Sequence, residues 1–266
     1  MNYQPNEIST SHTQAELKVA QITDCHLFAD VNGQHCGANV YLNLLKTLHA
    51  VKAHKPDLLI FTGDLTQDHT AQSYQRFVEA FKQTEINFPC YFLLGNHDDA
   101  QLMNEHLSSA PFQQDKTIES AHWQLVLLQS KSETPAGFFQ QAKHQKQFSS
   151  LSADKNTFAF MHHHPIDVGY FIDRHNLQNA DEFWQAMQAL PNVKGVACGH
   201  VHNALQLSYL GESSKQSIPL YTCPATSIQF DPQVDGVGAL PLGAGFRIFE
   251  FFASSELKTH VVFLES

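Results

Sequence analysis

The sequence predicts an α/β fold in which two mixed β-sheets pack face to face with helices on the outside. The first half of the chain alternates apolar, strand-like runs with amphipathic helical stretches, an order typical of parallel β-α-β units. The second half consists mainly of strand-like runs. With 266 residues and 42% hydrophobic content, the chain can bury a large core within one domain.

The first half predicts two helices, each placed between strands. Apolar residues recur at the spacing of one helix face from Val40 to Val51, and Pro56 ends that helix. Residues 58–61 form a continuous apolar run, which is typical of a strand buried on both faces. Residues 74–81 carry aromatic and apolar side chains at helical spacing and predict the second helix.

The second half adds six strand-like runs and no internal repeat. These runs span residues 123–128, 157–161, 193–198, 205–209, 245–251 and 259–263. We expect a single domain over residues 18–266, preceded by a disordered or loosely held segment at residues 1–17.

The chain is acidic, which argues against two classes of binding protein. It has 16 Lys and Arg against 26 Asp and Glu, a formal net charge of −10, and no basic cluster in the sequence. Proteins that bind nucleic acids or anionic membranes carry such a cluster, so we expect neither partner. An anionic small-molecule substrate is still compatible with this charge if bound cations supply positive charge locally.

Cysteine usage and hydropathy predict a cytoplasmic protein. The five cysteines are an odd number without C-x-x-C spacing, which argues against a disulfide framework and a thiolate zinc site. The first 18 residues are polar and lack the basic and apolar regions of a signal peptide. No run approaches the ~20 apolar residues of a membrane span.

Five short motifs rich in Asp, Asn and His each follow a predicted strand directly. Because strand ends gather at one edge of a sheet, carboxylate and imidazole groups from several motifs can converge there and hold metal ions. The motifs are Asp24-Cys25-His26, Gly63-Asp64, Gly95-Asn96-His97-Asp98, His162-His163-His164-Pro165 and Gly199-His200-Val201-His202.

In this order the motifs resemble those of the calcineurin-like metallophosphoesterases. Further phrases narrow the resemblance to the bacterial class III 3′,5′-cyclic AMP phosphodiesterases. The resemblance extends from about Val19 to Phe251 and implies a four-layer αββα sandwich. Its phrases are QITDCHLFAD (21–30), TGDLTQD (62–68), LLGNHD (93–98), HHHP (162–165), HNLQNADEF (175–183), CGHVHN (198–203) and CPATSIQF (223–230).

The resemblance implies two metal ions that share the carboxylate of one aspartate. One ion takes Asp24, His26, Asp64 and His202, and the other takes Asp64, Asn96, His162 and His200. We also expect six side chains to bind the substrate: His26, Asp64, Asn96, His97, His162 and His202.

The spacing of the residues supports parts of this set. Asp24 and His26 stand two apart, so their side chains point the same way on an extended segment. The same holds for the two histidines of the last motif. Adjacent side chains diverge, so the three consecutive histidines cannot all be ligands. His162, which directly follows the strand, is the expected ligand; His163 is the alternative, and His164 is expected to pack or to face solvent.

The implied donor set contains oxygen and nitrogen but no thiolate. Such a set suits two divalent or mixed-valence transition-metal ions, with iron and manganese favoured and zinc or cobalt as alternatives. Calcium and magnesium would require more oxygen ligands. Cys25 lies between two expected ligands, but its side chain should point away from them, so we assign it no catalytic part.

His97 is expected to be catalytic. By the resemblance it contacts the phosphate and the leaving oxygen, and an imidazole with a pKa near 6.5 readily donates a proton. Asp98 or Asp68 is expected to orient its ring. The two ions would generate a hydroxide that attacks 3′,5′-cyclic AMP, expels O3′ and yields 5′-AMP, which lowers the intracellular level of cyclic AMP. Phe230 is a candidate for stacking on the base.

Two other functions stay open at this point. The same site could serve another hydrolase, acting on glycerophosphodiesters, 2′,3′-cyclic nucleotides, phosphomonoesters or nucleic acids. The chain could also be a non-catalytic metal-binding scaffold that has kept the fold. The complete ligand set together with His97 argues against the scaffold, and the acidic composition argues against a nuclease. The oligomeric state is left open.

Overall fold

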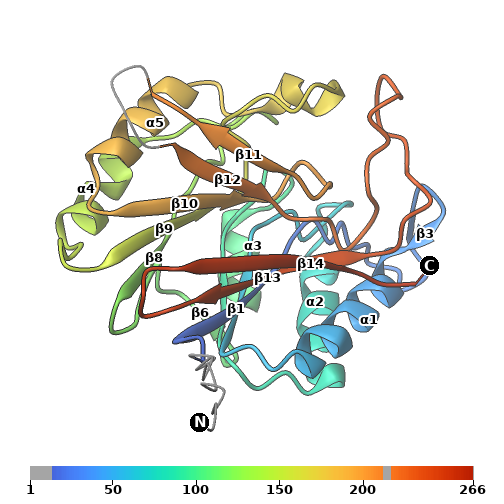
Figure 1. The fold of residues 1–266 in the computed structure, drawn as a ribbon. Helices are drawn as coiled ribbons and strands as arrows, with labels where there is room; N and C mark the ends of the chain where they lie inside the picture. Colours follow the sequence, from blue (N-terminus) through green and yellow to red (C-terminus); the bar gives the residue numbers. More distant parts are fainter. Residues whose placement is uncertain (1–13, 212–216, 266) are drawn as a thin grey trace, which may run out of the picture.

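Two six-stranded mixed sheets pack face to face in the computed structural model, which describes residues 14–211 and 217–265 (Figure 1). The first sheet has the order β14 (Leu257–Phe263), β13 (Gly245–Phe251), β1 (Leu17–Ile22), β4 (Leu58–Phe61), β5 (Cys90–Phe92), β6 (Phe112–Gln113). The second has the order β11 (Gln206–Tyr209), β12 (Ile218–Thr222), β10 (Val193–Cys198), β9 (Asn156–Met161), β8 (Trp123–Leu127), β7 (Thr117–Glu119).

Both sheets combine parallel and antiparallel pairs. In the first sheet, β13 runs antiparallel to β1 and β14, and the other pairs are parallel. In the second sheet, the edge strands β7 and β11 run antiparallel to their neighbours, and the central strands are parallel. The prediction of two mixed sheets is therefore confirmed. A short hairpin of β2 (Gln34–His35) and β3 (Ala38–Asn39) stands apart from both sheets.

The central strands are buried on both faces, as their continuous apolar runs predicted. Successive side chains of a strand point to opposite faces. Leu58 and Ile60 of β4 therefore join the core between the sheets, whereas Leu59 and Phe61 join the core beneath the helices. The core between the sheets is rich in aromatic rings, with Phe158 of β9 fully buried at 0% exposure.

Helices cover the two outer faces and complete four layers (Figure 1). The first sheet is covered by α1 (Val40–Ala53), α2 (Ala71–Thr84) and α3 (Ala100–His106). The second sheet is covered by α4 (Gln141–Ser149) and α5 (Ala180–Ala189), with the short 3₁₀ helix η1 (Phe171–His175) nearby in the chain. Side chains cap the first three helices, because Asn39, Thr70 and Asp99 each accept a backbone N–H of the first turn.

The elements with strong periodicity were predicted, and the weakly patterned ones were not. The helix with apolar positions from Val40 to Val51 is α1, and the aromatic positions 74–81 lie within α2. The six strands of the second half are confirmed to within two residues at each end. In contrast, α3, α4, α5 and β12 were missed. In α4, whose sequence is QAKHQKQFS, only His144 is buried, so no apolar stripe marks the helix.

Two expectations concern the ends and surface of the chain. Of the segment 1–17, which was expected to be disordered or loosely held, residues 1–13 lie outside the described chain. The strand β1 begins at Leu17. The single domain over 18–266 stays a prediction. Within the described ranges, the structure contains no helix with both the length and the apolar character needed to cross a membrane.

Candidate metal centre

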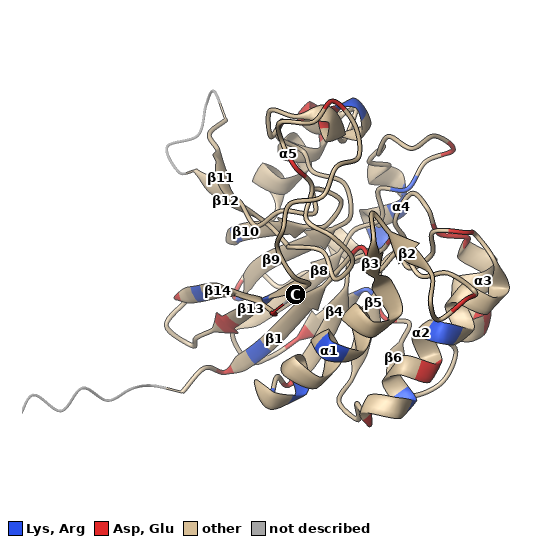
Figure 2. Ribbon diagram, turned by 90° about the vertical axis from the view of Figure 1, so that its right-hand side faces the viewer, with Lys and Arg blue, Asp and Glu red and all other residues tan. Residues whose placement is uncertain are grey.

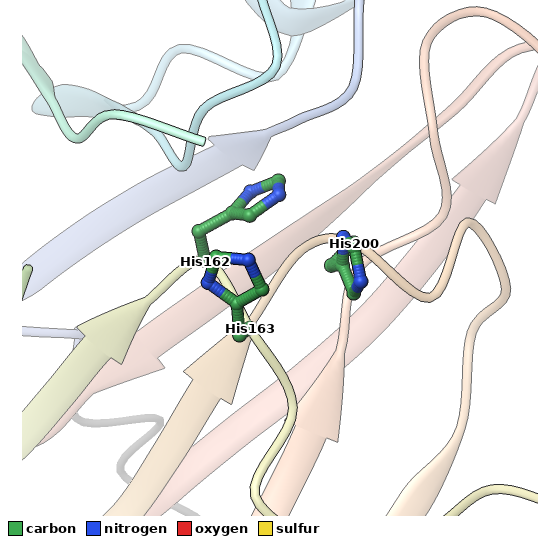
Figure 3. Close-up of side chains that lie close together, drawn as sticks. All are labelled: His162, His163 and His200. Atoms are coloured by element: carbon green, nitrogen blue, oxygen red, sulfur yellow. The ribbon is translucent and has the colours of Figure 1, made fainter. Parts of the chain in front are cut away.

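The five motifs meet at the carboxyl ends of five parallel strands. Asp24 follows β1, Asp64 follows β4, Asn96 follows β5, His162 follows β9, and the last two histidines follow β10. Figure 3 shows the rings of His162, His163 and His200 gathered where β9 and β10 end. The site thus lies at the edge where both sheets end, which is the usual place for ligands in open α/β sheets.

The backbone of the site is turned into an unusual conformation. Five of the seven expected metal ligands have positive φ angles, between 47° and 64°, in the left-handed region that non-glycine residues rarely adopt: Asp24, His26, Asp64, His200 and His202. Such strain costs free energy and is typical of functional sites, where the surrounding structure holds it in place. Gly95 is required for close approach, since a Cβ there would collide with the carboxylate of Asp64.

The first expected ion-binding group brings two imidazoles and two carboxylates together. The Nε2 atoms of His26 and His202 lie 3.1 Å apart. Nε2 of His202 lies 3.4 Å from Oδ1 of Asp24, and Nε2 of His26 lies 3.7 Å from Oδ2 of Asp64. Nδ1 of His202 donates to the backbone oxygen of Ile228 at 2.8 Å. In the neutral ring, Nε2 of His202 therefore carries a lone pair and faces other acceptors.

The second expected group is arranged in the same way around His162. Its Nε2 atom lies 3.1 Å from Oδ1 of Asn96 and 3.4 Å from Oδ2 of Asp64. Its Nδ1 atom donates to the backbone oxygen of Thr62 at 2.7 Å. In a metal-ligating histidine, one ring nitrogen usually donates to a carbonyl oxygen or a similar acceptor, and the other ring nitrogen stays free to bind the metal. His200 lies beside His162, with ring centroids 4.9 Å apart, and ligand atoms of His162, His163 and His200 lie within 4.8 Å of one another.

Two buried polar atoms of this cluster lack a hydrogen-bond partner among the described residues. Among the described residues, Oδ1 of Asp24 and Nε2 of His200 are buried without a hydrogen-bond partner. Buried polar atoms of a native protein are almost always paired, and buried charges are neutralised by an ion or an opposite charge. Convergent lone pairs from carboxylates, imidazoles and an amide oxygen suit a bound cation, so the residues present fit the two-ion site.

The charges of the side chains support the same conclusion. Burial by itself would raise the pKa of Asp64, but His162, His97 and His26 outweigh it and hold this pKa well below its usual range. Burial would lower the pKa of His162, yet Asp64 and Asp24 raise it to about 9. A proton on His162 thus neutralises part of the carboxylate charge in the metal-free chain, where a cation would otherwise do so.

The three consecutive histidines have three different environments. His162 is the one whose ring faces Asp64 and Asn96. Both ring nitrogens of His163 are engaged by other groups, with Nδ1 2.8 Å from Oγ of Ser130 and Nε2 3.2 Å from the backbone oxygen of Pro135.

His164 is buried and does not face solvent. Its Nε2 atom lies 2.9 Å from Oδ1 of Asp173, which also accepts the backbone N–H of Val168. Its ring packs at a centroid distance of 5.5 Å from that of His200. Of the two alternatives expected for His164, packing is confirmed.

His97 lies at the mouth of the metal cluster. Its backbone N–H donates to Oδ1 of Asp64 at 2.9 Å, and its ring meets that of His26 edge-on at a centroid distance of 4.8 Å. Burial lowers the pKa of His97, and the nearby Asp64 offsets part of that effect. The ring also stacks on that of His69, with centroids 5.5 Å apart and planes 10° apart.

The expectation that Asp98 or Asp68 orients the ring of His97 is wrong. The carboxylate of Asp98 accepts the backbone N–H groups of Asp64, Leu65 and Gly95 and so holds the loops together. The carboxylate of Asp68 accepts from Ala29, Thr70 and Thr66. Nδ1 of His97 is buried without a hydrogen-bond partner among the described residues.

Other expectations about neighbouring side chains have clear outcomes. Cys25 is buried in the core between the first sheet and its helices, and burial raises the pKa of its thiol, so it is inert.

Phe230 stacks flat on the ring of His202, with centroids 3.8 Å and planes 10° apart. One face of Phe230 is therefore covered by an expected metal ligand.

A cavity of about 280 Å³ opens over the cluster, close to the lower end of the ~300–1,000 Å³ typical of small-molecule sites. Sequence reasoning missed several residues of this cavity, including His35, Phe171, His175 and Gln67, whose amide oxygen lies 2.7 Å from Nδ1 of His26. Gln67 and His175 lie in the phrases TGDLTQD and HNLQNADEF, but they were assigned no role there, and no short motif marks His35 or Phe171.

A four-layer αββα sandwich with carboxylates, an amide and imidazoles converging at its strand ends defines a metal-dependent phosphoesterase. The chain belongs to the calcineurin-like phosphoesterase family, whose model matches residues 17–204. The resemblance noted in the motifs is thus confirmed.

Curated relatives are similar over nearly the whole chain. A protein of Colwellia psychrerythraea named as a probable cyclic nucleotide phosphodiesterase is 51% identical over 93% of this chain and 95% of its own length. The 3′,5′-cyclic adenosine monophosphate phosphodiesterase CpdA of Vibrio vulnificus is 35% identical over 97% of this chain and 94% of its own. A zebrafish (Danio rerio) dimetal phosphatase shares the fold, with a TM-score of 0.64 at 11% identity over 90% of this chain and 94% of that one.

Proposed function

We propose that this protein is a dinuclear-metal phosphodiesterase that hydrolyses 3′,5′-cyclic AMP to 5′-AMP. The observation that carries the proposal is the convergence of buried acceptor atoms around Asp64 from both sheets, at a site that fits two cations. The family and the names of the relatives support the reaction class and the substrate.

Each ion would be held by four of the seven clustered side chains. One would be held by Asp24, His26, Asp64 and His202, and the other by Asp64, Asn96, His162 and His200. When bound, two such ions lower the pKa of a coordinated water to give a nucleophile at neutral pH, and they offset the charge of the phosphate. We favour iron or manganese, with zinc or cobalt as alternatives, since the donors are oxygen and nitrogen.

The chain itself supplies the proton for the leaving group. His97 stands beside the cluster and lines the cavity, and a protonated imidazole can act as a general acid. As the bond from phosphorus to O3′ breaks, His97 donates a proton to O3′. Six side chains would surround the phosphate: His26, Asp64, Asn96, His97, His162 and His202.

The size and charge of the molecule support a small-molecule substrate used inside the cell. The cavity of about 280 Å³ suits a single nucleotide better than a polymer. The formal charge of −10 disfavours nucleic acid as a partner. All five cysteines are free thiols and four of them are buried, which supports a reducing compartment and hence the cytoplasm.

A substrate panel with product identification tests this proposal. Metal-loaded protein is incubated separately with 3′,5′-cyclic AMP, 2′,3′-cyclic AMP, glycerophosphodiesters and bis(nitrophenyl) phosphate, and the products are separated by chromatography. We expect 5′-AMP from 3′,5′-cyclic AMP, and little action on 5′-AMP itself. Formation of 3′-AMP, or far faster cleavage of glycerophosphodiesters, would overturn the substrate assignment and leave the family assignment intact.

A further inference from the structure

A second and larger cavity lies on the side of the molecule where the two sheets end in β6 and β7. Its volume is about 730 Å³, against about 280 Å³ for the cavity over the metal cluster, and the two share no lining residue within the described chain. Phe92 of β5, Thr117 of β7, Leu127 of β8 and residues of α4 form its walls. This volume is typical of sites for small molecules.

Lys116 brings an uncompensated positive charge into this cavity. Its Nζ atom donates to the backbone oxygen of Phe92 at 2.6 Å and lies 4.2 Å from the centroid of the Phe92 ring. An ammonium group has three donors, and this is the one hydrogen bond that Nζ makes to the described residues. No carboxylate of those residues lies within 4.0 Å of it. Burial lowers the pKa of Lys116 to about 8, so a bound anion would stabilise its charged form.

Two further lysines stand at the rim of the same cavity. Lys143 and Lys146 are three residues apart on α4 and therefore share one face of the helix, where Figure 2 shows basic segments. Both are exposed, and neither pairs with an acidic side chain of the described chain. Among the residues that the structure describes, Asp115 is the one acidic residue that lines the cavity, so three positive charges face one negative charge in a protein whose net charge is −10.

The rest of the wall is partly apolar and partly polar. Its apolar members are Phe92, Leu93, Leu94 and Leu127, and the ring of Phe92 lies next to the ammonium group of Lys116. The other lining residues carry polar side chains: Asn104, Thr117, Gln129, His144, Gln147 and Ser150. A ligand with an anionic group and an apolar body would fit this cavity. Its anionic group would pair with the lysines, and its body would be removed from water.

We propose that this cavity is a second ligand site, which binds a small organic anion with an aromatic or apolar body. The anionic group binds Lys116 and faces Lys143 and Lys146, and the body packs on the apolar part of the wall, where Leu94 is the partly exposed member. Leu94 in the wall directly precedes the Gly95-Asn96-His97 loop, so a bound ligand contacts the strand end that carries two residues of the candidate active site.

Calorimetric titration of the metal-loaded protein with two sulfonates tests the proposal. Benzenesulfonate carries the anion and an aromatic ring, whereas methanesulfonate carries the anion alone. We expect benzenesulfonate to bind with one site per chain and methanesulfonate to bind at least about 10-fold more weakly. The variant Lys116→Met, which has a similar side-chain volume, should weaken benzenesulfonate about 10-fold or more, the scale for losing a hydrogen bond to a charged group.

Two further variants separate the cavity from general charge effects. Lys46→Met removes an exposed lysine of α1 that does not line the cavity, and it should leave the affinity unchanged. The double variant Lys143→Met and Lys146→Met changes only exposed positions and should weaken binding without affecting folding. Equal affinity of Lys116→Met and the unaltered protein for benzenesulfonate, or equal affinity of the two sulfonates, would overturn the proposal.

Discussion

Nδ1 of His162 lies 2.7 Å from the backbone oxygen of Thr62, and this hydrogen bond joins the two sheets at the candidate metal site. Thr62 follows β4 of the first sheet, and His162 follows β9 of the second. Because a carbonyl oxygen can only accept, the bond requires a proton on Nδ1 and directs Nε2 toward Asp64. The packing of the sheets and the orientation of a proposed ligand therefore depend on one another.

The variant His97→Ala should separate proton donation from metal binding. His97 lies beside the cluster, but it is not among the proposed ligands, so the variant should keep its metal and lose turnover of 3′,5′-cyclic AMP by roughly 10²–10⁴-fold. Metal content and steady-state rates measure the two effects. The loss should be smaller for bis(nitrophenyl) phosphate, whose leaving group needs no proton. Equal losses on both substrates would show that His97 binds phosphate and does not donate the proton.

The variants His162→Ala and His163→Ala should differ in which property they lose. His162 faces Asp64 and Asn96, so its removal should reduce metal content. Both ring nitrogens of His163 serve Ser130 and Pro135, so its removal should keep the metal. It should instead lower the free energy of unfolding by about 1–3 kcal/mol, the cost of leaving a buried partner unpaired. Elemental analysis and urea unfolding of both variants check this. Metal loss confined to His163→Ala would reverse the assignment.

The core between the sheets should be the most sensitive part of the fold. Phe158 is fully buried and contacts the rings of Phe160, Phe249 and Phe251 at centroid distances of 5.1 to 5.4 Å. Phe158→Ala should therefore reduce the free energy of unfolding by about 3–5 kcal/mol. Leu42→Ala, at a position 48% exposed on α1, serves as the control and should change it by at most about 0.5 kcal/mol. Similar losses in both variants would contradict this description of the core.

Strong local patterns explain why much of the fold could be predicted from sequence. Apolar residues recur along one face of α1, because that face packs on the core. Continuous apolar runs mark β4 and β9, because these strands are buried on both faces. The helix α4 escaped prediction because its contacts with the second sheet come from few apolar residues in a polar sequence.

The residues of the candidate site could be expected from the sequence, but the groups that orient their side chains could not. Each expected member sits in a short motif after a strand, and the resemblance carried by these motifs gave its expected role. The partners that orient the rings, such as the backbone oxygens of Thr62 and Ile228, carry no signal in their side chains. The wrong expectation for Asp98 has the same origin, because the loop turns its carboxylate back onto backbone N–H groups, away from the neighbouring ring.

The metal content of the purified protein and of Asp64→Ala tests the central claim most directly. The carboxylate of Asp64 lies 3.7 Å from Nε2 of His26 and 3.4 Å from Nε2 of His162, so it stands between the two proposed ion sites. Elemental analysis after expression in metal-supplemented medium should find about two transition-metal ions per chain, as a two-metal site requires. Asp64→Ala should lose both ions, whereas Asn96→Ala should weaken mainly one. A single ion or none in the unaltered protein, or full occupancy and activity in Asp64→Ala, would contradict the shared two-ion centre.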